Sequence, residues 1–210
     1  MTKILIADDH PVFRQGLKQI LMSASESIIV EEANNGQEVL NMIYKNSYDA
    51  MFLDISMPGR NGLEVLQELK RVKPNIPVLI LSMHSEDQYA VRAMKAGASG
   101  YLTKDGEANE FVMALQKVLS GKVYFSSAVV EQLISGFDKK GDKAAHELLS
   151  DREYQVMRMI ASGQKLKDIA NELSLSLSAV STHRTRILRK MNMKSNADII
   201  RYALKEGLVE

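Results

Sequence analysis

The sequence contains no cysteine, so it can form neither a disulfide framework nor a metal site with thiolate ligands. It also lacks long apolar runs. The longest, such as VLIL and MFL, fall far short of the roughly 20 residues that a membrane-spanning helix needs. The N-terminus lacks the basic, long apolar and small-residue segments of a signal peptide. We therefore expect a soluble cytoplasmic protein.

What is present indicates a globular chain of one or two domains. Of its 210 residues, 45% are hydrophobic, which is enough for a sizeable core. The formal net charge of +1 is unevenly distributed: residues 1–120 hold 12 Lys+Arg and 15 Asp+Glu, whereas residues 147–210 hold 11 and 8. Residues 173–197 contain five basic residues and no acidic one. This segment fits a polyanionic partner, although a solvated helix face is the common alternative.

Apolar and amphipathic segments alternate through the first 120 residues. Five short apolar runs predict strands, namely KILIA, SIIVEE, AMFLD, PVLILS and GYLT. Between them lie segments with helical spacing, such as Phe13, Leu17, Ile20, Leu21 and Ala24. Five strands alternating with five helices predict an α/β domain, in which helices cover both faces of one parallel sheet.

The pattern changes in the second half of the chain. Residues 122–147 hold the polar segment SGFDKKGDKAAHE, which indicates a linker. Residues 150–207 then show only helical patterns, with short breaks between them. We therefore expect a first domain over residues 1–121, a linker over residues 122–147 and a small all-α domain over residues 148–210.

Polar side chains stand at the carboxyl ends of the predicted strands, where open parallel sheets form their sites. They are Asp8 and Asp9 after the first strand, Asp54 on the third, Ser82 on the fourth and Lys104 after the fifth. Three carboxylates in one place need a cation, and a hard divalent ion with oxygen ligands, above all Mg²⁺, suits them. With a lysine and a hydroxyl beside them, they predict an aspartate that accepts a phosphoryl group.

Each of these residues also has a structural explanation when it is taken alone. Asp9, shortly before Pro11, could be a helix N-cap. Asp54, followed by SMPG, could simply lead into a turn, and Lys104 could be a surface lysine. Their coincidence at the expected strand ends of one repeated pattern argues against these separate explanations.

The motifs ADDHP, FLDISMPGRNG, LILSMH and GYLTKD occur in this order at the strand ends. They resemble the receiver domain of bacterial two-component response regulators, over about residues 1–120. The resemblance implies a flavodoxin-like sheet of strand order 2-1-3-4-5. Asp105 stands where many receivers carry a proline after the lysine, so their cis-proline is absent here.

The same resemblance implies a role for each residue of the site. Asp54 would be the phosphoacceptor and would coordinate Mg²⁺ together with Asp9, while Asp8 would act through water. The main-chain carbonyl of Ser56 would complete the protein ligands. Ser82 and Lys104 would bind the oxygens of the phosphoryl group. Tyr101 would be the aromatic residue that changes its rotamer with Ser82. Ser56 and His84 would influence how fast the phosphoaspartate hydrolyses.

Residues 166–191 predict a helix-turn-helix. One helical stripe is followed by the turn SLSLS, after which Ser176 or Ser178 can cap a second helix. That second helix has an apolar face and, opposite it, a small polar face with basic flanks that can enter a DNA major groove. The candidate DNA contacts are Ser178, Ser181, Thr182, Thr185, Arg186, Arg189, Lys190 and Lys194, the last two toward phosphates.

Two further residues of this helix have their own predictions. We expect His183 to be a partly buried structural residue, because it falls near the apolar stripe. Arg184 also falls near that stripe, so it would have to extend outward to reach a phosphate.

The segments LSDREYQVMRMIASG, DIANELSLSLSAVSTHRTRILRKM and NADIIRYAL resemble the LuxR-type helix-turn-helix of the NarL/FixJ response regulators, over about residues 148–207. The two resemblances together imply a transcription factor and not an enzyme. A sensor histidine kinase would phosphorylate Asp54, and phosphorylation would favour a homodimer that binds paired half-sites in double-stranded DNA.

Two other functions compete with this interpretation. The first is a Mg²⁺-dependent phosphatase with an aspartyl-phosphate intermediate. Many such enzymes use a second aspartate two residues further on as acid and base, but Ser56 holds that position here. The second is a constitutive DNA-binding protein whose first domain is only a dimerisation scaffold. The complete set of Asp8, Asp9, Asp54 and Lys104 argues against it.

Overall fold

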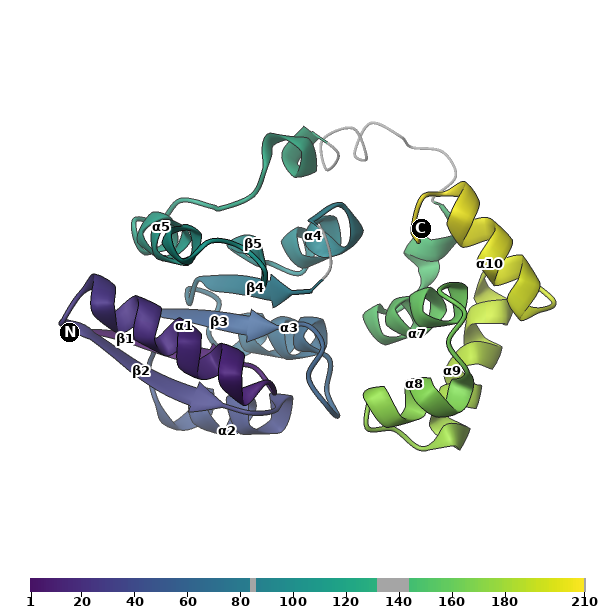
Figure 1. The fold of residues 1–210 in the computed structure, drawn as a ribbon, viewed down its shortest axis with the longest axis horizontal. Coiled ribbons are helices and arrows are strands. Elements are labelled where there is room, and N and C mark those ends of the chain that lie inside the picture. The colour runs from purple at the N-terminus through teal and green to yellow at the C-terminus, as the bar shows by residue number, and fades with distance from the viewer. Residues whose placement is uncertain (84–85, 132–143, 210) are drawn as a thin grey trace. The chain divides into compact units, whose positions relative to one another are not determined.

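The computed structural model describes residues 1–83, 86–131 and 144–209 (Figure 1). The chain divides into two compact units, Met1–Asp138 and Lys139–Glu210. The most polar part of the segment predicted as a linker, and His84, lie outside the described residues. Each unit is treated by itself below.

The first unit alternates strand and helix, as the hydrophobic pattern predicts. In chain order it contains β1 (Thr2–Ala7), α1 (Pro11–Ala24), β2 (Ile28–Ala33), α2 (Gly36–Lys45), β3 (Ala50–Asp54), α3 (Gly62–Val72), β4 (Val78–Ser82), α4 (Glu86–Lys95), β5 (Gly100–Thr103) and α5 (Ala108–Leu119). The strands are parallel and follow the order β2-β1-β3-β4-β5. The predicted flavodoxin-like fold is therefore confirmed.

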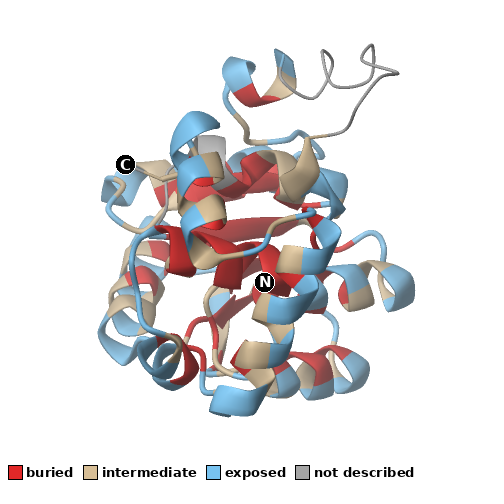
Figure 2. Cartoon of the chain, turned by 90° about the vertical axis from the view of Figure 1, so that its right-hand side faces the viewer, coloured by how far each residue is buried: buried red, intermediate tan, exposed pale blue. Residues whose placement is uncertain are grey.

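Helices cover both faces of this sheet. On one face, α1 and α5 bury Leu17, Leu21, Phe111 and Leu115 against alternate residues of β1, β3, β4 and β5. Figure 2 shows the buried residues concentrated in the strands, with exposed residues on the outer sides of the helices. The central strands β3 and β4 are buried along their whole length, which explains why their sequences are continuously apolar.

The strand register aligns the polar strand ends. Asp54 pairs with Leu81, and Ser82 pairs with Thr103. Lys104 follows directly, and its backbone N–H donates to the carbonyl of Ser82 at 2.8 Å. The ends of β3, β4 and β5 therefore form one edge of the sheet.

The capping alternative for Asp9 is wrong. Helix α1 has His10 at its N-cap position, without a side-chain cap, and begins with Pro11. It is Asp8 that accepts a hydrogen bond nearby, from the backbone N–H of His10 at 2.8 Å. A proline in the first helical turn needs no N–H partner, which lowers the demand for a capping side chain.

After α5 the chain returns to the edge of the sheet. Tyr124 forms an isolated parallel bridge with Gly100. Its N–H donates to the carbonyl of Ser99 at 2.7 Å, and its carbonyl accepts from the N–H of Tyr101 at 3.1 Å. The first residues of the predicted linker are thus hydrogen-bonded to β5.

The described part of the second unit contains only helices. They are the 3-10 helix η1 (Ala145–Leu148), α7 (Asp151–Ala161), α8 (Leu166–Glu172), α9 (Leu177–Lys190) and α10 (Asn196–Lys205). Helices α7 and α10 each begin with a capping box, at Ser150 and Ser195. Helix α9 is capped by Ser176, whose side chain accepts from the N–H of Ala179 at 3.1 Å. The all-α prediction holds for these residues.

The helices of the structure were compared with the requirements for a membrane span. Within residues 1–83, 86–131 and 144–209, no helix combines the length and the apolar character needed to cross a bilayer.

Candidate metal centre and nucleic-acid interface

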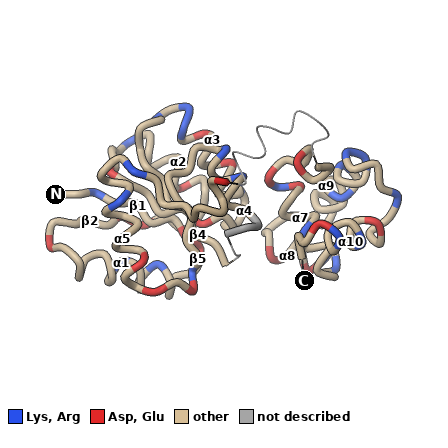
Figure 3. The backbone as a smooth tube through the Cα atoms, turned by 90° about the horizontal axis from the view of Figure 1, so that it is seen from above, with Lys and Arg blue, Asp and Glu red and all other residues tan. Residues whose placement is uncertain are grey.

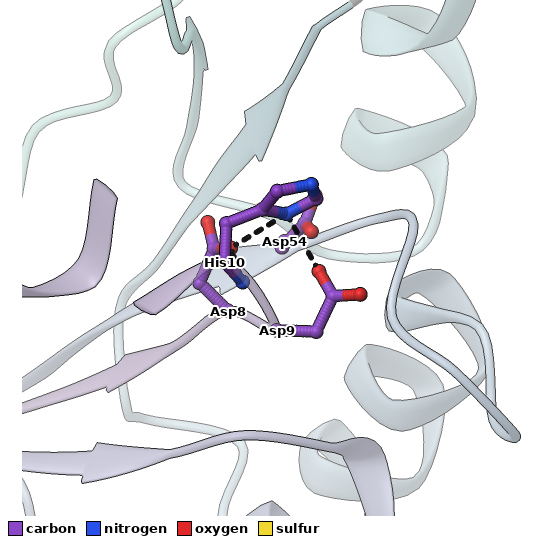
Figure 4. A group of neighbouring side chains, drawn as sticks. All are labelled: Asp8, Asp9, His10 and Asp54. Carbon is purple, nitrogen blue, oxygen red and sulfur yellow. Dashed lines mark hydrogen bonds and ion pairs between the residues drawn. The ribbon is translucent and has the colours of Figure 1, made fainter. Parts of the chain in front are cut away.

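Asp8, Asp9, His10 and Asp54 converge at the carboxyl ends of β1 and β3 (Figure 4). One ligand atom from each lies within 4.8 Å of the others. Asp8 is 0% exposed and Asp54 is 1% exposed, so both carboxylates have lost nearly all contact with solvent. Buried carboxylates this close together repel one another strongly unless a cation compensates them.

Lys104 supplies one such cation. Its ammonium lies 2.7 Å from Oδ2 of Asp8 and 2.9 Å from Oδ2 of Asp54, and its side chain is only 4% exposed. One ammonium therefore faces two buried carboxylates, and the centre keeps an excess of negative charge.

This charge balance is reflected in two pKa values. Burial raises the pKa of Asp54 to about 6, the attraction of Lys104 opposes this rise, and the repulsion of Asp8 adds to it. For Lys104, burial alone would lower the pKa, but attraction to Asp54 and a hydrogen bond to Asp8 outweigh it, and the pKa is raised. Lys104 is therefore a fixed positive charge, whereas ionised Asp54 is under electrostatic strain.

The donor set fits a hard divalent cation. Asp8, Asp9 and Asp54 offer carboxylate oxygens, which is the ligand type that such ions prefer, and a cation here would offset the excess negative charge. The second Asp54 oxygen, Oδ1, accepts a hydrogen bond from the backbone N–H of Ser56 at 3.1 Å. That contact fixes the direction of the Asp54 side chain.

His10 is a member of this group that sequence reasoning missed. Its Nδ1 lies 2.8 Å from Oδ1 of Asp9 and 3.3 Å from Oδ1 of Asp8; Figure 4 shows both contacts as dashed lines. The motif ADDHP shows that His10 follows two aspartates in the sequence. This position alone does not determine whether the imidazole is directed toward their carboxylates.

The remaining predicted receiver residues lie on the adjoining strands. Ser82 is fully buried at the end of β4. Tyr101 is 3% exposed on β5 and lines a cavity of about 400 Å³ together with Glu110, Lys117 and Tyr124. No peptide bond of the described residues is cis, including the one between Lys104 and Asp105.

Asn61 and Gly62 also shape the centre and were not predicted. Oδ1 of buried Asn61 accepts from the N–H of Leu63 at 2.8 Å and so caps α3. A Cβ at Gly62 would lie 2.0 Å from the backbone carbonyl oxygen of Asp54, closer than any contact allows. The glycine therefore permits the start of α3 to pack directly against Asp54.

In the second unit, α8 and α9 form the predicted helix-turn-helix. Val180 and Ile187 bury the inner face of α9. Figure 3 shows Lys and Arg residues along α9. The exposed members of the predicted DNA-binding set are Ser178, Thr182, Thr185, Arg186, Arg189, Lys190 and Lys194, while Ser181 is half-buried.

Two of the basic residues are held by contacts within the unit. The Lys190 ammonium lies 2.6 Å from Oε2 of Glu153, on α7. Nε of Arg184 donates to Oδ1 of Asn196 at 2.6 Å, so this guanidinium is directed toward α10. His183 is half-buried, in accord with its predicted structural position.

Each of the two units matches a known protein family. Residues 4–116 match the response regulator receiver domain, and residues 147–203 match the LuxR family of bacterial regulatory proteins. The chain belongs to the NarL/FixJ family of response regulators. It is a two-component regulator with a helix-turn-helix DNA-binding domain, in a family of transcription regulators.

The curated relatives of this response regulator match it over almost its full length. It is 32% identical to the response regulator UvrY of Escherichia coli strain K12, covering 99% of this chain and 96% of UvrY. It is 33% identical to the response regulator GacA of Pseudomonas aeruginosa strain PAO1, covering 100% of this chain and 99% of GacA.

Solved structures of other response regulators share the fold. The response regulator ChrA of a heme-sensing two-component system is 29% identical, with a TM-score of 0.51 and coverage of 99% of this chain and 98% of that one. RcsB of Salmonella enterica serovar Typhimurium, bound to a promoter in the presence of the phosphomimetic BeF3−, is 25% identical, with a TM-score of 0.58 and coverage of 96% and 97%.

Proposed function

We propose that this response regulator accepts a phosphoryl group on Asp54 from a sensor histidine kinase, and that the modification controls its binding to DNA. A carboxylate oxygen of Asp54 forms the new bond to phosphorus while the bond between phosphorus and the donor breaks. The observation that carries the proposal is the contact of the Lys104 ammonium with buried Asp8 and Asp54, at 2.7 Å and 2.9 Å.

The proposed roles of the surrounding residues follow from their positions. Lys104 remains charged, so it can bind an oxygen of the incoming phosphoryl group after it leaves the carboxylates. Ser82 ends the neighbouring strand and can donate its hydroxyl to another phosphoryl oxygen. The backbone N–H of Ser56 keeps the Asp54 carboxylate oriented.

The proposed cofactor is Mg²⁺. The residues that would hold it are Asp9 and Asp54, through their carboxylates, and Ser56, through its main-chain carbonyl, while Asp8 would act through water. When bound, Mg²⁺ supplies charge neutralisation for the carboxylates and the phosphoryl oxygens. The excess of two buried carboxylates over one ammonium supports a cation at this place.

The proposed switch runs from Ser82 to Tyr101. Binding of the phosphoryl group draws the Ser82 hydroxyl inward, and Tyr101 changes its rotamer in response. Tyr101 borders a cavity of about 400 Å³, and its backbone N–H donates to the carbonyl of Tyr124. A movement at Tyr101 is therefore next to the segment that leaves the receiver.

The proposed output is binding of double-stranded DNA by α9, with a homodimer favoured by phosphorylation or by DNA. Exposed Arg186, Arg189 and Lys194 offer positive charge for phosphates, and the small polar face between them fits a major groove. We retain the proposed domain limits, with a receiver over residues 1–121, a linker over residues 122–147 and a DNA-binding domain over residues 148–210.

The two competing functions are less well supported. A phosphatase needs an acid and base beside the nucleophile, and the hydroxyl of Ser56, two residues from Asp54, cannot serve as one. A constitutive DNA-binding protein would not need an ammonium buried against two carboxylates, because such a cluster adds little net stability to the fold.

The chemistry can be tested by mass spectrometry of the intact protein after incubation with acetyl phosphate and Mg²⁺. The proposal predicts the mass increase of one phosphoryl group, which EDTA abolishes and which the Asp54→Asn variant lacks. A phosphoryl adduct of the same yield on Asp54→Asn would contradict the assignment. Steady release of inorganic phosphate from a phosphate ester would favour the phosphatase instead.

A further inference from the structure

The hydroxyl groups on the exposed face of α9 are already engaged within the helix. Oγ1 of Thr182 donates to the backbone carbonyl of Ser178, and Oγ1 of Thr185 donates to that of Ser181, both at 2.9 Å. The Ser178 hydroxyl lies 3.0 Å from that of Ser176. A threonine hydroxyl has only one hydrogen, so neither threonine keeps a donor for a base.

With its hydroxyl hydrogen engaged, each of the two threonines can offer a base only a methyl group and an acceptor oxygen. Both side chains are exposed, and in each the hydroxyl is turned back to the carbonyl four residues earlier. Thr182 and Thr185 share one helical face with Ser178 and Arg189. The middle of the predicted groove-facing surface therefore has small side chains that carry methyl groups and no free threonine donor.

The rest of α9 offers few alternatives for reading bases. Its sequence, LSAVSTHRTRILRK, has no asparagine or glutamine, the side chains that bind adenine through two hydrogen bonds. Arg184 is directed to Asn196, and Lys190 contacts Glu153. The exposed Arg186 and Arg189 can still contact DNA phosphates or guanine bases.

We infer that α9 recognises thymine through apolar contact between the methyl groups of Thr182 and Thr185 and the C5-methyl groups of thymine in the major groove. The inference rests on the proposed DNA-binding function and assigns it a sequence preference. The C5-methyl is the one apolar group that a T·A pair presents in the major groove. The predicted half-site therefore contains thymine opposite these two side chains.

The probe is a duplex selected from random DNA by the full-length protein with acetyl phosphate and Mg²⁺. In a series of further duplexes, one thymine at a time is replaced by uracil. Each replacement removes one methyl group and leaves the base-pair hydrogen bonds unchanged. At the contacted positions, uracil should weaken binding about fourfold, as expected for one buried methyl group. Other thymine positions serve as internal controls.

Matched protein variants locate the partner of each methyl group. The Thr182→Ser and Thr185→Ser variants keep the hydroxyl and its hydrogen bond to the backbone carbonyl but lose the methyl group. Each variant should therefore bind the thymine duplex about fourfold less tightly. Each should also lose its sensitivity to uracil at one position. Thr182→Val and Thr185→Val keep methyl groups and lose the hydroxyl, so they should retain that sensitivity. Circular dichroism confirms that the variants fold.

Three results would overturn the inference while leaving DNA binding intact: a selected duplex without thymine, equal affinity for all uracil copies, or full uracil sensitivity in both serine variants. Failure to select any duplex would instead overturn the proposed DNA-binding function, and the inference with it.

Discussion

The Lys104 ammonium lies 2.9 Å from Oδ2 of Asp54, and both groups are almost completely buried. A buried ion pair contributes little net stability on its own, because desolvation offsets the attraction. Loss of one partner, however, leaves the other charge buried and uncompensated. The pair is therefore better explained by the chemistry of the site than by the stability of the fold.

Replacement of Lys104 by methionine should destabilise the receiver. Asp8 and Asp54 would then be two buried carboxylates without their ammonium, which should lower the free energy of unfolding by about 3 kcal/mol at pH 8. Urea unfolding measures the change. Asp54→Asn in the same background should recover part of the loss, because it removes one of the two charges. Equal stability of Lys104→Met and the parent protein would contradict the electrostatic account.

Gly62→Ala should disturb the phosphoacceptor. The added Cβ would meet the Asp54 carbonyl oxygen at 2.0 Å, so the loop between β3 and α3 must shift. We expect lower stability and slower incorporation of the phosphoryl group from acetyl phosphate. Gly16→Ala is the matched control: nothing lies within 4 Å of its added Cβ, and alanine inside α1 should stabilise the helix by about 0.5–1 kcal/mol. Normal phosphorylation of Gly62→Ala would refute this role of the glycine.

The contact between Glu153 and Lys190 should make the DNA-binding unit sensitive to acid. Although burial raises the pKa of Glu153, the hydrogen bonds from Lys190 and from the Ser150 backbone outweigh it and lower that pKa below its usual value of 4.5. A lowered pKa in the folded state contributes stability above pH 4.5, and this contribution disappears as the pH falls through the folded-state value.

Glu153→Gln tests that relationship, because glutamine does not titrate. At pH 7 the parent protein should be more stable than the variant by about 1 to 2 kcal/mol, and the difference should shrink as the pH falls below 4.5. Urea unfolding of the full-length protein, followed by NMR signals of α7 and α9, measures both values. A stability difference that stays constant between pH 7 and pH 3.5 would show that the carboxylate charge is not involved.

Lys194→Ala should reduce the salt dependence of DNA binding. If the Lys194 ammonium contacts a phosphate, its loss should lower the slope of log K against log salt by about 0.9, at every DNA sequence alike. Fluorescence anisotropy at several salt concentrations measures the slope. Lys205→Ala, at the exposed end of α10, is a control of equal charge and should leave the slope unchanged. Equal slopes for both variants would show that the Lys194 ammonium does not contact a DNA phosphate.

The sequence was sufficient for the receiver fold because its signals are local and repeated. Continuously apolar runs marked β3 and β4, helical spacing marked α1 and α5, and one parallel sheet brings the ends of such strands together. From these patterns alone, Asp8, Asp54, Ser82 and Lys104 are expected at one edge of the sheet. The strand register then brought Asp54 and Ser82 onto adjacent strand ends.

Contacts between distant segments could not be predicted in the same way. Glu153 and Lys190 are 37 positions apart, and nothing in the period of either helix indicates that they meet. Arg184 turns to Asn196 and not outward, because the start of α10 offers it an acceptor at 2.6 Å. The contact of His10 with Asp9 depends on a side-chain rotamer, and the close approach at Gly62 depends on the packing of α3 against β3.

The central claim is that phosphorylation of Asp54 controls DNA binding. The most direct measurement is the affinity of the full-length protein for its selected duplex, with and without acetyl phosphate and Mg²⁺, for the parent protein and for Asp54→Asn. The account predicts that the donor tightens binding by the parent protein and leaves the variant unchanged. An equal gain in affinity for both proteins, or no gain for the phosphorylated parent protein, would contradict it.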